Sequence, residues 1–408
     1  MPTSSPPVAV FDDTWSPTLT FTYSLGRRGV PLHFYGSGSG QWTRFRHTRA
    51  ACPPPGLPDE FLPWLQEKIA AGTIARIAPT SDLIAYYISA LRDHFPRDVA
   101  RAIAPLSEIE ACLIKSRFAD RCLSVGCETP AVASPTGLDE ALEAAERLGY
   151  PVILKPKSHL GLGFAERGSI AHSADELRQQ FRPYSVQSGQ NYFLSRYPEL
   201  PWPLLQKYLP AAQRRVYSVS GVRDRDTGIV SAAVSFKGEQ WPPGVGTSIR
   251  QVGVNDPRIL TAGLGVVEHF LSSGIFELEL VEDADGGLNA IDLNPRGFGF
   301  MGLDLARGQD LPWLWYSSTL HPVTPLDQST LIDAVEAVPP AIGLWVLLAN
   351  SIAGPSKKRA IVSMLGHGAD PAPLVRSNLA HLKHPRSLLR AQWHAYRTHR
   401  DRLAPAAP

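Results

Sequence analysis

Cysteine is scarce in this 408-residue sequence, which contains four cysteines. No two of them lie in a C-x-x-C pair, and none belongs to a cysteine–histidine group with the spacing of a zinc site. This scarcity excludes a disulfide-rich secreted scaffold, a class that relies on many closely spaced cysteines. We therefore expect reduced cysteines in a cytoplasmic protein.

Long hydrophobic runs are also missing. The sequence starts with MPTSSPPVAVFDD, which has neither the basic segment nor the apolar segment of a secretory signal. The most apolar later run, AIGLWVLLA at 341–349, is shorter than the roughly 18 residues that a membrane-spanning helix needs. We expect no membrane span and interpret residues 341–349 as a buried helix.

Neither sign of charge is in excess, since the net charge is +2 and the pI is about 8.3. Such a balance does not favour nucleic acid as a partner. Hydrophobic residues make up 44% and charged residues 19% of the chain, which is typical of a soluble globular protein. The length exceeds that of one ordinary core, so we expect two to four domains or subdomains.

The N-terminal part of the sequence alternates strand and helix patterns. An apolar run at 8–12 is followed by a helix-like stretch that ends at Gly29, and then by the strand-like VPLHFYG. This order predicts a βαβ unit and a parallel sheet, so we expect residues 1–110 to form a Rossmann-like α/β domain. Further along, IARIAPTSD predicts another strand. The GSGSG loop at 36–40 matches no phosphate-binding fingerprint, and the chain contains no P-loop motif.

Isolated lysines mark the elements that follow. The stretch SEIEACLIKSRFADRCLSVG predicts one continuous helix that carries Lys115 and stops at Gly126. The strand PVILKPKS then carries Lys155, and a small glycine turn follows at 161–163. Ammonium groups suit phosphates as compact charges, and glycine lets a backbone close over a phosphate. A later strand, LLQKYLP, offers main-chain groups to the edge of a base.

Two hairpins are predicted: one from RRVYSVSGVRD and GIVSAAVSFKG, which a loop over EQWPPGVGTS follows, and one from FELEL and AIDLNPR. The second hairpin carries the most distinctive pattern. Side chains two residues apart in a strand share a face, so Asp292, Asn294 and Arg296 lie on one face. Glu277 and Glu279 share a face of the partner strand, and both are candidate metal ligands. We favour Glu279, because it lies nearer the turn and opposite Asp292. Oxygen ligands of this kind suit Mg²⁺, and acids placed so close together are destabilising unless they share a cation.

These elements, in this order, resemble the ATP-grasp superfamily over roughly residues 1–325. The resemblance implies a mixed α/β and α+β fold, in which a Rossmann-like N-terminal domain precedes two α+β subdomains that grip MgATP. The implied boundaries are 1–110 for the N-terminal domain, 111–200 for the small subdomain, 201–330 for the large subdomain with the metal site, and 331–408 for a helical C-terminal extension.

The resemblance also implies a role for each matching residue in binding ATP. Lys115 and Lys155 resemble the two phosphate-binding lysines, and Lys237 resembles a third cation that reaches the terminal phosphate. Arg296, in the NPR segment, resembles the arginine that holds the transferred phosphoryl group or the substrate carboxylate. The adenine hinge corresponds to Gln206, Lys207, Tyr208 and Leu209.

Two of the matching positions depart from the family pattern. Glu279, Asp292 and Asn294 resemble the ligands of Mg²⁺, or of Mn²⁺ in its place, but the family more often has glutamate where Asp292 stands. Gln213 occupies the position at which the family often has a ribose-binding glutamate. Arg250 is a further candidate contact for the substrate or a phosphate.

The resemblance implies an ADP-forming ligase that activates a carboxylate as an acyl phosphate and joins it to an amine. The segments SLGRRGVPL and SFKGEQWPPGVGTS resemble predicted carboligases that include D-aspartate ligase-like enzymes. Two alternatives stay open: a carboxylase-type enzyme that activates bicarbonate, and a non-catalytic nucleotide-binding regulator, for which Asp292 and Gln213 leave room. We expect small-molecule carboxylate and amine substrates and no nucleic acid, and the resemblance allows a homodimer.

Overall fold

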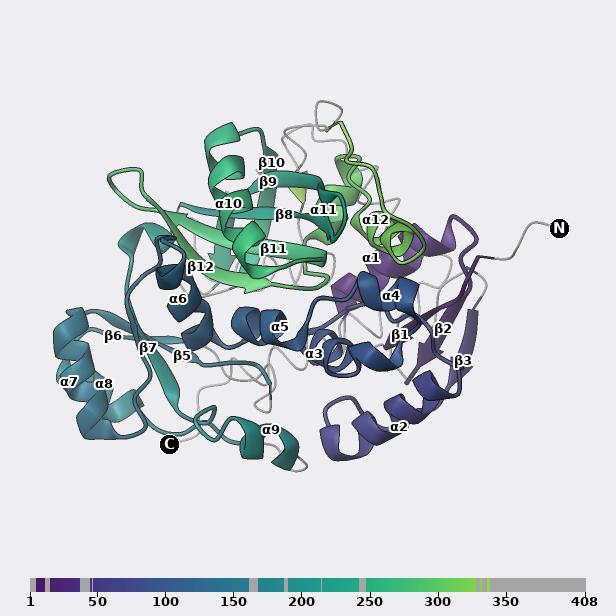
Figure 1. Cartoon of the computed structure of the whole chain (residues 1–408). Helices are drawn as coiled ribbons and strands as arrows, with labels where there is room; N and C mark the ends of the chain where they lie inside the picture. Colours follow the sequence, from purple (N-terminus) through teal and green to yellow (C-terminus); the bar gives the residue numbers. More distant parts are fainter. Residues whose placement is uncertain are drawn as a thin grey trace, which may run out of the picture.

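The computed structural model describes residues 5–11, 15–36, 45, 47–160, 168–186, 190–213, 215–241, 247–327, 331 and 336–337. Within these residues the strands form three sheets, of three, four and six strands. The N-terminal sheet and the four-stranded sheet lie at opposite ends of the molecule, and helices α3 (Asp82–Ala90) and α5 (Leu106–Leu113) lie between them (Figure 1).

The N-terminal sheet confirms the expected βαβ unit. Strands β1 (Val8–Phe11) and β2 (Leu32–Tyr35) are parallel and are connected by α1 (Trp15–Gly26). Strand β3 (His47–Ala50) is parallel to β2 at the edge of the sheet. All four residues of β1 are buried, as a parallel strand covered on both faces requires.

The prediction of a strand over IARIAPTSD is wrong. Only Ile77 pairs there, through an isolated parallel bridge to Ala9. The Thr80 hydroxyl donates to the Phe11 carbonyl, and Ser81 already caps the next helix by accepting a hydrogen bond from the Ile84 amide. The helical elements of this unit are α2 (Pro58–Ala70), α3 (Asp82–Ala90), the 3₁₀ turn η2 (Arg92–His94) and α4 (Arg97–Arg101).

The continuous helix expected around Lys115 is broken into two. Helix α5 (Leu106–Leu113) ends at Ile114, whose backbone is extended, and α6 (Lys115–Ser124) begins immediately afterwards. The Lys115 amide donates to the Lys157 carbonyl at 2.8 Å instead of to a helical carbonyl. A contact with a distant strand end therefore interrupts a helical pattern and places Lys115 at the start of α6.

A four-stranded sheet, the small sheet, follows with the order β4-β7-β5-β6. Its apolar face packs against two helices, and Ser173 caps the second of these by accepting a hydrogen bond from the Glu176 amide. A short helix, α9, precedes β7. The bounds are β4 (Val132–Ala133), α7 (Leu138–Leu148), β5 (Val152–Pro156), β6 (Ser169–Ala171), α8 (Ala174–Gln180), α9 (Asn191–Arg196) and β7 (Pro203–Lys207).

The six-stranded sheet, the large sheet, has the order β12-β11-β8-β9-β10-β13 and is antiparallel. Both expected hairpins are present, but β9 continues through Glu239–Trp241, where the sequence pattern predicted a loop. One face packs on the long helix α10. The bounds are β8 (Val216–Asp224), β9 (Gly228–Trp241), β10 (Thr247–Val254), α10 (Pro257–Phe270), β11 (Gly274–Glu282), β12 (Leu288–Asn294) and β13 (Glu336–Ala337).

Two short helices after the NPR segment join the large sheet to the N-terminal unit. Helices α11 (Met301–Ala306) and α12 (Leu311–Ser318) share a hydrophobic core with residues of α1, β1 and β2. Of the expected helical extension 331–408, the structure describes residue 331 and the two residues of β13, which form a strand. The rest of that extension, including the run at 341–349, lies outside the described residues.

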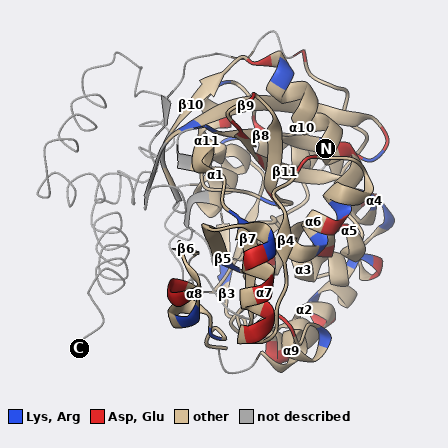
Figure 2. Ribbon diagram, turned by 90° about the vertical axis from the view of Figure 1, so that its left-hand side faces the viewer, with Lys and Arg blue, Asp and Glu red and all other residues tan. Residues whose placement is uncertain are grey.

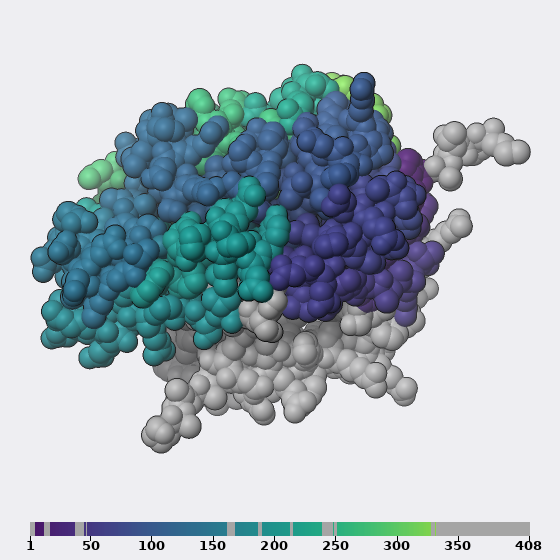
Figure 3. Space-filling model, turned by 60° about the horizontal axis from the view of Figure 1, so that its bottom comes forward, coloured from purple at the N-terminus to yellow at the C-terminus, as the bar shows by residue number. Residues whose placement is uncertain are grey.

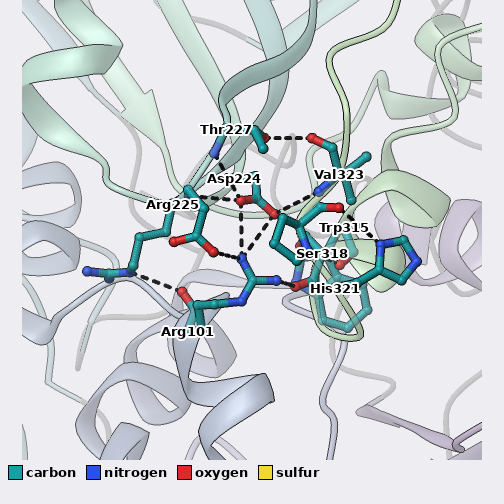
Figure 4. Close-up of polar contacts among 10 residues, drawn as sticks. Arg101, Asp224, Arg225, Thr227, Trp315, Ser318, His321 and Val323 are labelled. Atoms are coloured by element: carbon teal, nitrogen blue, oxygen red, sulfur yellow. Dashed lines mark hydrogen bonds and ion pairs between the residues drawn. The ribbon is translucent and has the colours of Figure 1, made fainter.

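Ion pairs also fasten the N-terminal unit to the large sheet (Figure 4). Arg101 of α4 lies 3.2 Å from the fully buried Asp224 carboxylate at the end of β8, and it donates to the Ser318 carbonyl. Arg225 donates in turn to the Arg101 carbonyl at 3.1 Å. These contacts lie at the C-terminal end of β8, and they hold the N-terminal unit and the large sheet together.

The segment that carries α9 lies against the N-terminal unit as well (Figure 3). The Tyr86 and Tyr197 hydroxyls are 3.1 Å apart, and Glu110 accepts hydrogen bonds from Tyr197 and Arg196. Basic and acidic residues are both spread over the ribbon, and acidic residues gather on α7 (Figure 2). No helix among the described residues is both long and apolar enough to span a membrane.

Candidate active site

Strands β11 and β12 place four polar side chains in two facing pairs. Glu279 is the register partner of Asp292, and Glu277 is the partner of Asn294. Paired residues of an antiparallel ladder share a face, so these four side chains lie together, as the period of two predicted. Glu277 is 5% exposed and accepts a hydrogen bond from Ser218, whereas the Glu279 side chain is 23% exposed.

Two of the predicted lysines reach these carboxylates. The Lys115 ammonium lies 2.7 Å from Asp292 Oδ1. Lys237 contacts Glu279 Oε1 and lies 3.7 Å from Glu277 Oε1. Burial by itself lowers the pKa of Lys115 and Lys237, but the neighbouring carboxylates outweigh burial and raise the pKa of both. Both lysines are therefore fully charged at neutral pH.

Lys155 approaches the same place from the small sheet. Its ammonium donates to Gln206 Oε1 at 2.8 Å, which links the lysine of β5 to the hinge strand β7. Burial, and then the positive charge of Lys115, lower the pKa of Lys155 to about 8. The charges of Asp292 and Glu279 only partly offset these effects, so an anionic ligand beside Lys155 would be favourable.

Arg296 has its three guanidinium nitrogens placed by three different groups. Nη2 donates to Asn294 Oδ1 at 2.8 Å, and Nη1 donates to the Gly297 carbonyl at 2.8 Å. Nε donates to Asp82 Oδ1 at 2.5 Å. The sequence reasoning missed Asp82, which is 4% exposed and begins α3. The one sequence signal was that Asp82 belongs to the polar residues that end the strand predicted over IARIAPTSD.

The hinge residues lie at the end of β7. Gln206 is 6% exposed, Lys207 is exposed, and the Lys207 amide donates to the Ala131 carbonyl at 2.9 Å. Tyr208 and Leu209 follow directly and lead into the 3₁₀ turn η3 (Pro210–Gln213). In the antiparallel β5–β7 pair, Lys207 lies opposite Val152 and Lys155 lies opposite Leu204, so the side chain of Gln206 connects the hinge segment to Lys155.

Several predicted site features cannot be placed. The side chain of Gln213 lies outside the described residues, and so does that of Arg250 on β10. The glycine turn at 161–163 and residues 37–40 of the GSGSG loop also lie outside them. Their expected roles stay predictions.

The oxygen ligands fit a hard divalent cation by their chemistry. Glu279, Asp292 and Asn294 offer only carboxylate and amide oxygens, the donors that Mg²⁺ prefers. Among the described residues, no three His, Cys, Asp or Glu side chains gather as a ready-made metal cluster. Each of the two carboxylates is paired with a lysine instead. The two lysines balance the negative charge of the carboxylates. With a metal ion and phosphates bound, the metal would balance the carboxylates and the phosphates would balance the lysines.

Comparison with known proteins identifies the fold. No protein-family model matches the chain. The carbamoyl phosphate synthase large chain of Hyperthermus butylicus is 31% identical over 130 residues, which are 32% of this chain and 11% of that protein. The β subunit of an ADP-forming succinate–CoA ligase from Haloarcula marismortui is 30% identical over 145 residues, 35% of this chain and 33% of that one. The chain thus matches a third or less of the length of these curated relatives.

Solved structures match most of the chain. Biotin carboxylase from Campylobacter jejuni superposes with a TM-score of 0.59 at 12% identity, covering 81% of this chain and 74% of that one. The L-amino acid ligase of Bacillus licheniformis gives a TM-score of 0.56 at 14% identity, covering 82% and 78%. These neighbours are ATP-grasp proteins, and the chain has the ATP-grasp fold.

Proposed function

We propose that this protein is an ATP-dependent, ADP-forming ligase that couples a carboxylate to an amine. The observation that carries the proposal is that Lys115 and Lys237 contact the acid pair of β11 and β12, while the charge of Asp292 also acts on Lys155 and Arg296. Four cations around two carboxylates suit a polyphosphate and a metal ion bound together. A pure binding module would have no need for both the metal ligands and the phosphoryl-binding arginine.

The chemistry in this proposal has two steps. A carboxylate oxygen of the acid attacks the γ-phosphorus of ATP. The bond between the γ-phosphorus and the oxygen of the β-phosphate breaks, so that ADP is the leaving group and an acyl phosphate is formed. The amine nitrogen then attacks the acyl carbon, inorganic phosphate leaves, and a proton is lost from nitrogen to give the amide. Lys115 and Lys155 hold the phosphates, Lys237 and Arg296 neutralise the transferring group, and Gln206 to Leu209 bind adenine.

Mg²⁺, or Mn²⁺ in its place, would be held by Glu279, Asp292 and Asn294. When bound it would supply charge neutralisation at the phosphates. Glu279 is the better ligand of the two candidate glutamates, because Glu277 is more buried and accepts hydrogen bonds from both Ser218 and Asn294.

A second candidate function is activation of bicarbonate. It is favoured by the neighbours themselves, which include biotin carboxylase and a carboxyaminoimidazole ribonucleotide synthase from Aspergillus clavatus with a TM-score of 0.56. The Aspergillus clavatus structure is a complex with ATP. Bicarbonate is a carboxylate of minimal size, so the same cations would serve it.

One experiment separates these candidates. The protein is incubated with MgATP, hydroxylamine and a pool of amino acids and other small carboxylic acids, and mass spectrometry follows ADP and hydroxamates. We expect ADP together with one hydroxamate, which names the acid. ADP formation that depends on bicarbonate alone would favour the second candidate, and AMP would contradict the acyl-phosphate route. Bound ATP without turnover would favour a regulator. An Asp292→Ala variant, which lacks a proposed metal ligand, serves as the inactive control.

A related structure also bears on assembly. The biotin carboxylase domain of a 2-oxoglutarate carboxylase from Hydrogenobacter thermophilus, with a TM-score of 0.61, is described as a dimer. We propose a homodimer for this chain, and light scattering coupled to size exclusion measures it directly. A monomer at micromolar concentration would contradict the proposal.

A further inference from the structure

We infer that Asp82 is a positioning residue for phosphoryl transfer, through which the N-terminal unit aligns Arg296. The inference rests on the proposed function and adds a residue that the sequence reasoning did not assign. If Asp82 has this role, the N-terminal unit contributes to the chemical step in addition to any contact that it makes with a substrate.

The segment 79–82 is itself held firmly by the N-terminal sheet. The Thr80 hydroxyl donates to the Phe11 carbonyl of β1 at 3.2 Å, and Ser81 caps α3. Asp82 is the first residue of that nine-residue helix, where a negative charge is favourable. Its carboxylate therefore projects from a rigid support.

The NPR segment docks onto this support through two separate contacts. The Gly297 amide donates to the Pro79 carbonyl at 2.8 Å, and Arg296 Nε donates to Asp82 Oδ1 at 2.5 Å. A Cβ atom at Gly297 would lie 3.0 Å from the Phe21 ring and 3.1 Å from Pro17. Glycine at this position permits the close approach that brings the arginine to Asp82.

The remaining contacts of Arg296 define what Asp82 contributes. A guanidinium carries five N–H donors. Asn294 at the end of β12 and the Gly297 carbonyl three residues later engage the two terminal nitrogens, and Asp82 engages Nε. Among the described contacts, one N–H on each terminal nitrogen is left for oxygen atoms of a phosphoryl group or a carboxylate. Asp82 thereby fixes the plane of the Arg296 guanidinium group through a contact that the large sheet does not provide.

The electrostatic surroundings agree with this role. Burial by itself lowers the pKa of Arg296, and Asp82 is the largest of the influences that raise it. The same carboxylate also favours the charged form of Lys115. Removing Asp82 leaves a buried guanidinium without its ionic partner, and a small misplacement of such a group lowers a rate by as much as about 100-fold.

The test compares Asp82→Ala and Asp82→Asn with Arg296→Ala and with the double variant Asp82→Ala/Arg296→Ala. We expect Asp82→Ala to lower kcat for acid-dependent ADP formation about 10- to 100-fold while the Kd for MgATP changes less than about threefold. Asp82→Asn keeps an oxygen acceptor and loses less. Because Asp82 acts through Arg296, the double variant should be no slower than Arg296→Ala alone.

A matched control breaks another ion pair between the same two units. Asp224→Asn removes the buried partner of Arg101 (Figure 4), so it should lower thermal stability without the selective loss of kcat. Equal losses of kcat in Asp82→Ala and Asp224→Asn, or an Asp82→Ala effect that multiplies that of Arg296→Ala, would overturn the inference in favour of a purely structural role.

A second measurement needs no knowledge of the acid. MgADP with aluminium fluoride mimics the transferring phosphoryl group, and calorimetry measures its binding. Asp82→Ala should weaken this complex about tenfold or more while MgADP alone binds as to the wild type. Equal binding of the mimic by wild type and variant would refute the role of Asp82. No binding of MgADP by the wild type would instead refute the proposed function, together with the inference that rests on it.

Discussion

At the scale of single residues, the charge of the site depends on the pKa values of its lysines as well as on where those lysines lie. Lys155 differs from the other site lysines because it has an amide rather than a carboxylate as its partner. Burial, and then the charge of Lys115, lower its pKa by more than the charges of Asp292 and Glu279 raise it. Lys115 and Lys237 have acid partners and stay charged.

The lowered pKa of Lys155 predicts a pH dependence of nucleotide binding. Its ordinary pKa of 10.5 falls to about 8, and a phosphate binds the ammonium form in preference to the neutral amine. MgATP affinity should therefore be constant below pH 8 and fall above it, by at most about tenfold per pH unit for one linked proton. Binding titrations between pH 7 and 9.5 measure this. Lys155→Arg stays charged throughout and should remove the fall; a wild-type affinity that is flat over this range would contradict the prediction.

The two glutamates of β11 should differ in their effect on metal dependence. Glu279→Gln should raise the half-saturating Mg²⁺ concentration for nucleotide binding by about tenfold or more, because a direct ligand is lost. Glu277→Gln should raise it less, because Glu277 is engaged by Ser218 and Asn294. Glu282→Gln, at the end of the same strand and paired with Arg258, is the matched control and should leave it unchanged. A larger effect of Glu277→Gln would reverse the assignment.

At the scale of elements, the large sheet is the support on which the site is built. Strand β8 lies between β11 and β9 and supplies Ser218, which holds Glu277. Close packing of these strands depends on Gly221, where a Cβ atom would lie 2.3 Å from the Ser231 carbonyl oxygen and 2.6 Å from the Phe276 ring. The backbone oxygen cannot move away without breaking the β8–β9 ladder.

Gly221→Ala should therefore destabilise the protein. We expect a loss of about 1–3 kcal/mol in the free energy of unfolding, the range typical of overpacking. Gly265→Ala is the matched control, since Gly265 lies on the exposed face of α10 with no atom within 4 Å of an added Cβ. It should stabilise the helix by about 0.5–1 kcal/mol. Thermal and denaturant unfolding measure both changes, and equal stabilities of the two variants would show that β8 tolerates the methyl group.

At the scale of the whole molecule, the site is assembled from three units that are distant in sequence. The small sheet contributes Lys155, the large sheet contributes the acids and Arg296, and the N-terminal unit contributes Asp82. Lys115 begins α6, and its amide bonds to the segment that follows β5. A ligand that contacts all of these units should stabilise the folded chain as a whole.

MgATP should accordingly raise the unfolding temperature, and removal of the metal should cancel most of the gain. At a ligand concentration 100 times Kd the gain is about 2.7 kcal/mol. EDTA leaves Glu279 and Asp292 facing the phosphates without a shared cation, so ATP with EDTA should stabilise the chain much less. Differential scanning fluorimetry with MgATP, with ATP plus EDTA and with Mg²⁺ alone measures this. Equal stabilisation by ATP with and without the metal would contradict a metal-dependent site.

Much of the molecule follows from patterns that lie within short stretches of sequence. The βαβ start, the two hairpins and the shared face of Asp292, Asn294 and Arg296 follow from periods of two and of about 3.6 residues, because each period reports a local backbone geometry. The order of the lysine, hinge and acid segments was enough to indicate the ATP-grasp fold. These features need no knowledge of distant contacts.

Tertiary structure alone decided the rest. The break at Ile114 arises because the Lys115 amide bonds to Lys157, so helical periodicity gave no warning of it. Asp82 and Arg296 are separated by 214 positions, and no pattern within either segment predicts their ion pair. The lowered pKa of Lys155 likewise depends on burial and on a neighbouring charge from another element. Local periodicity thus determined which elements form and what chemistry they carry, whereas packing between distant segments determined which charges meet, because contact between them is a property of the folded chain.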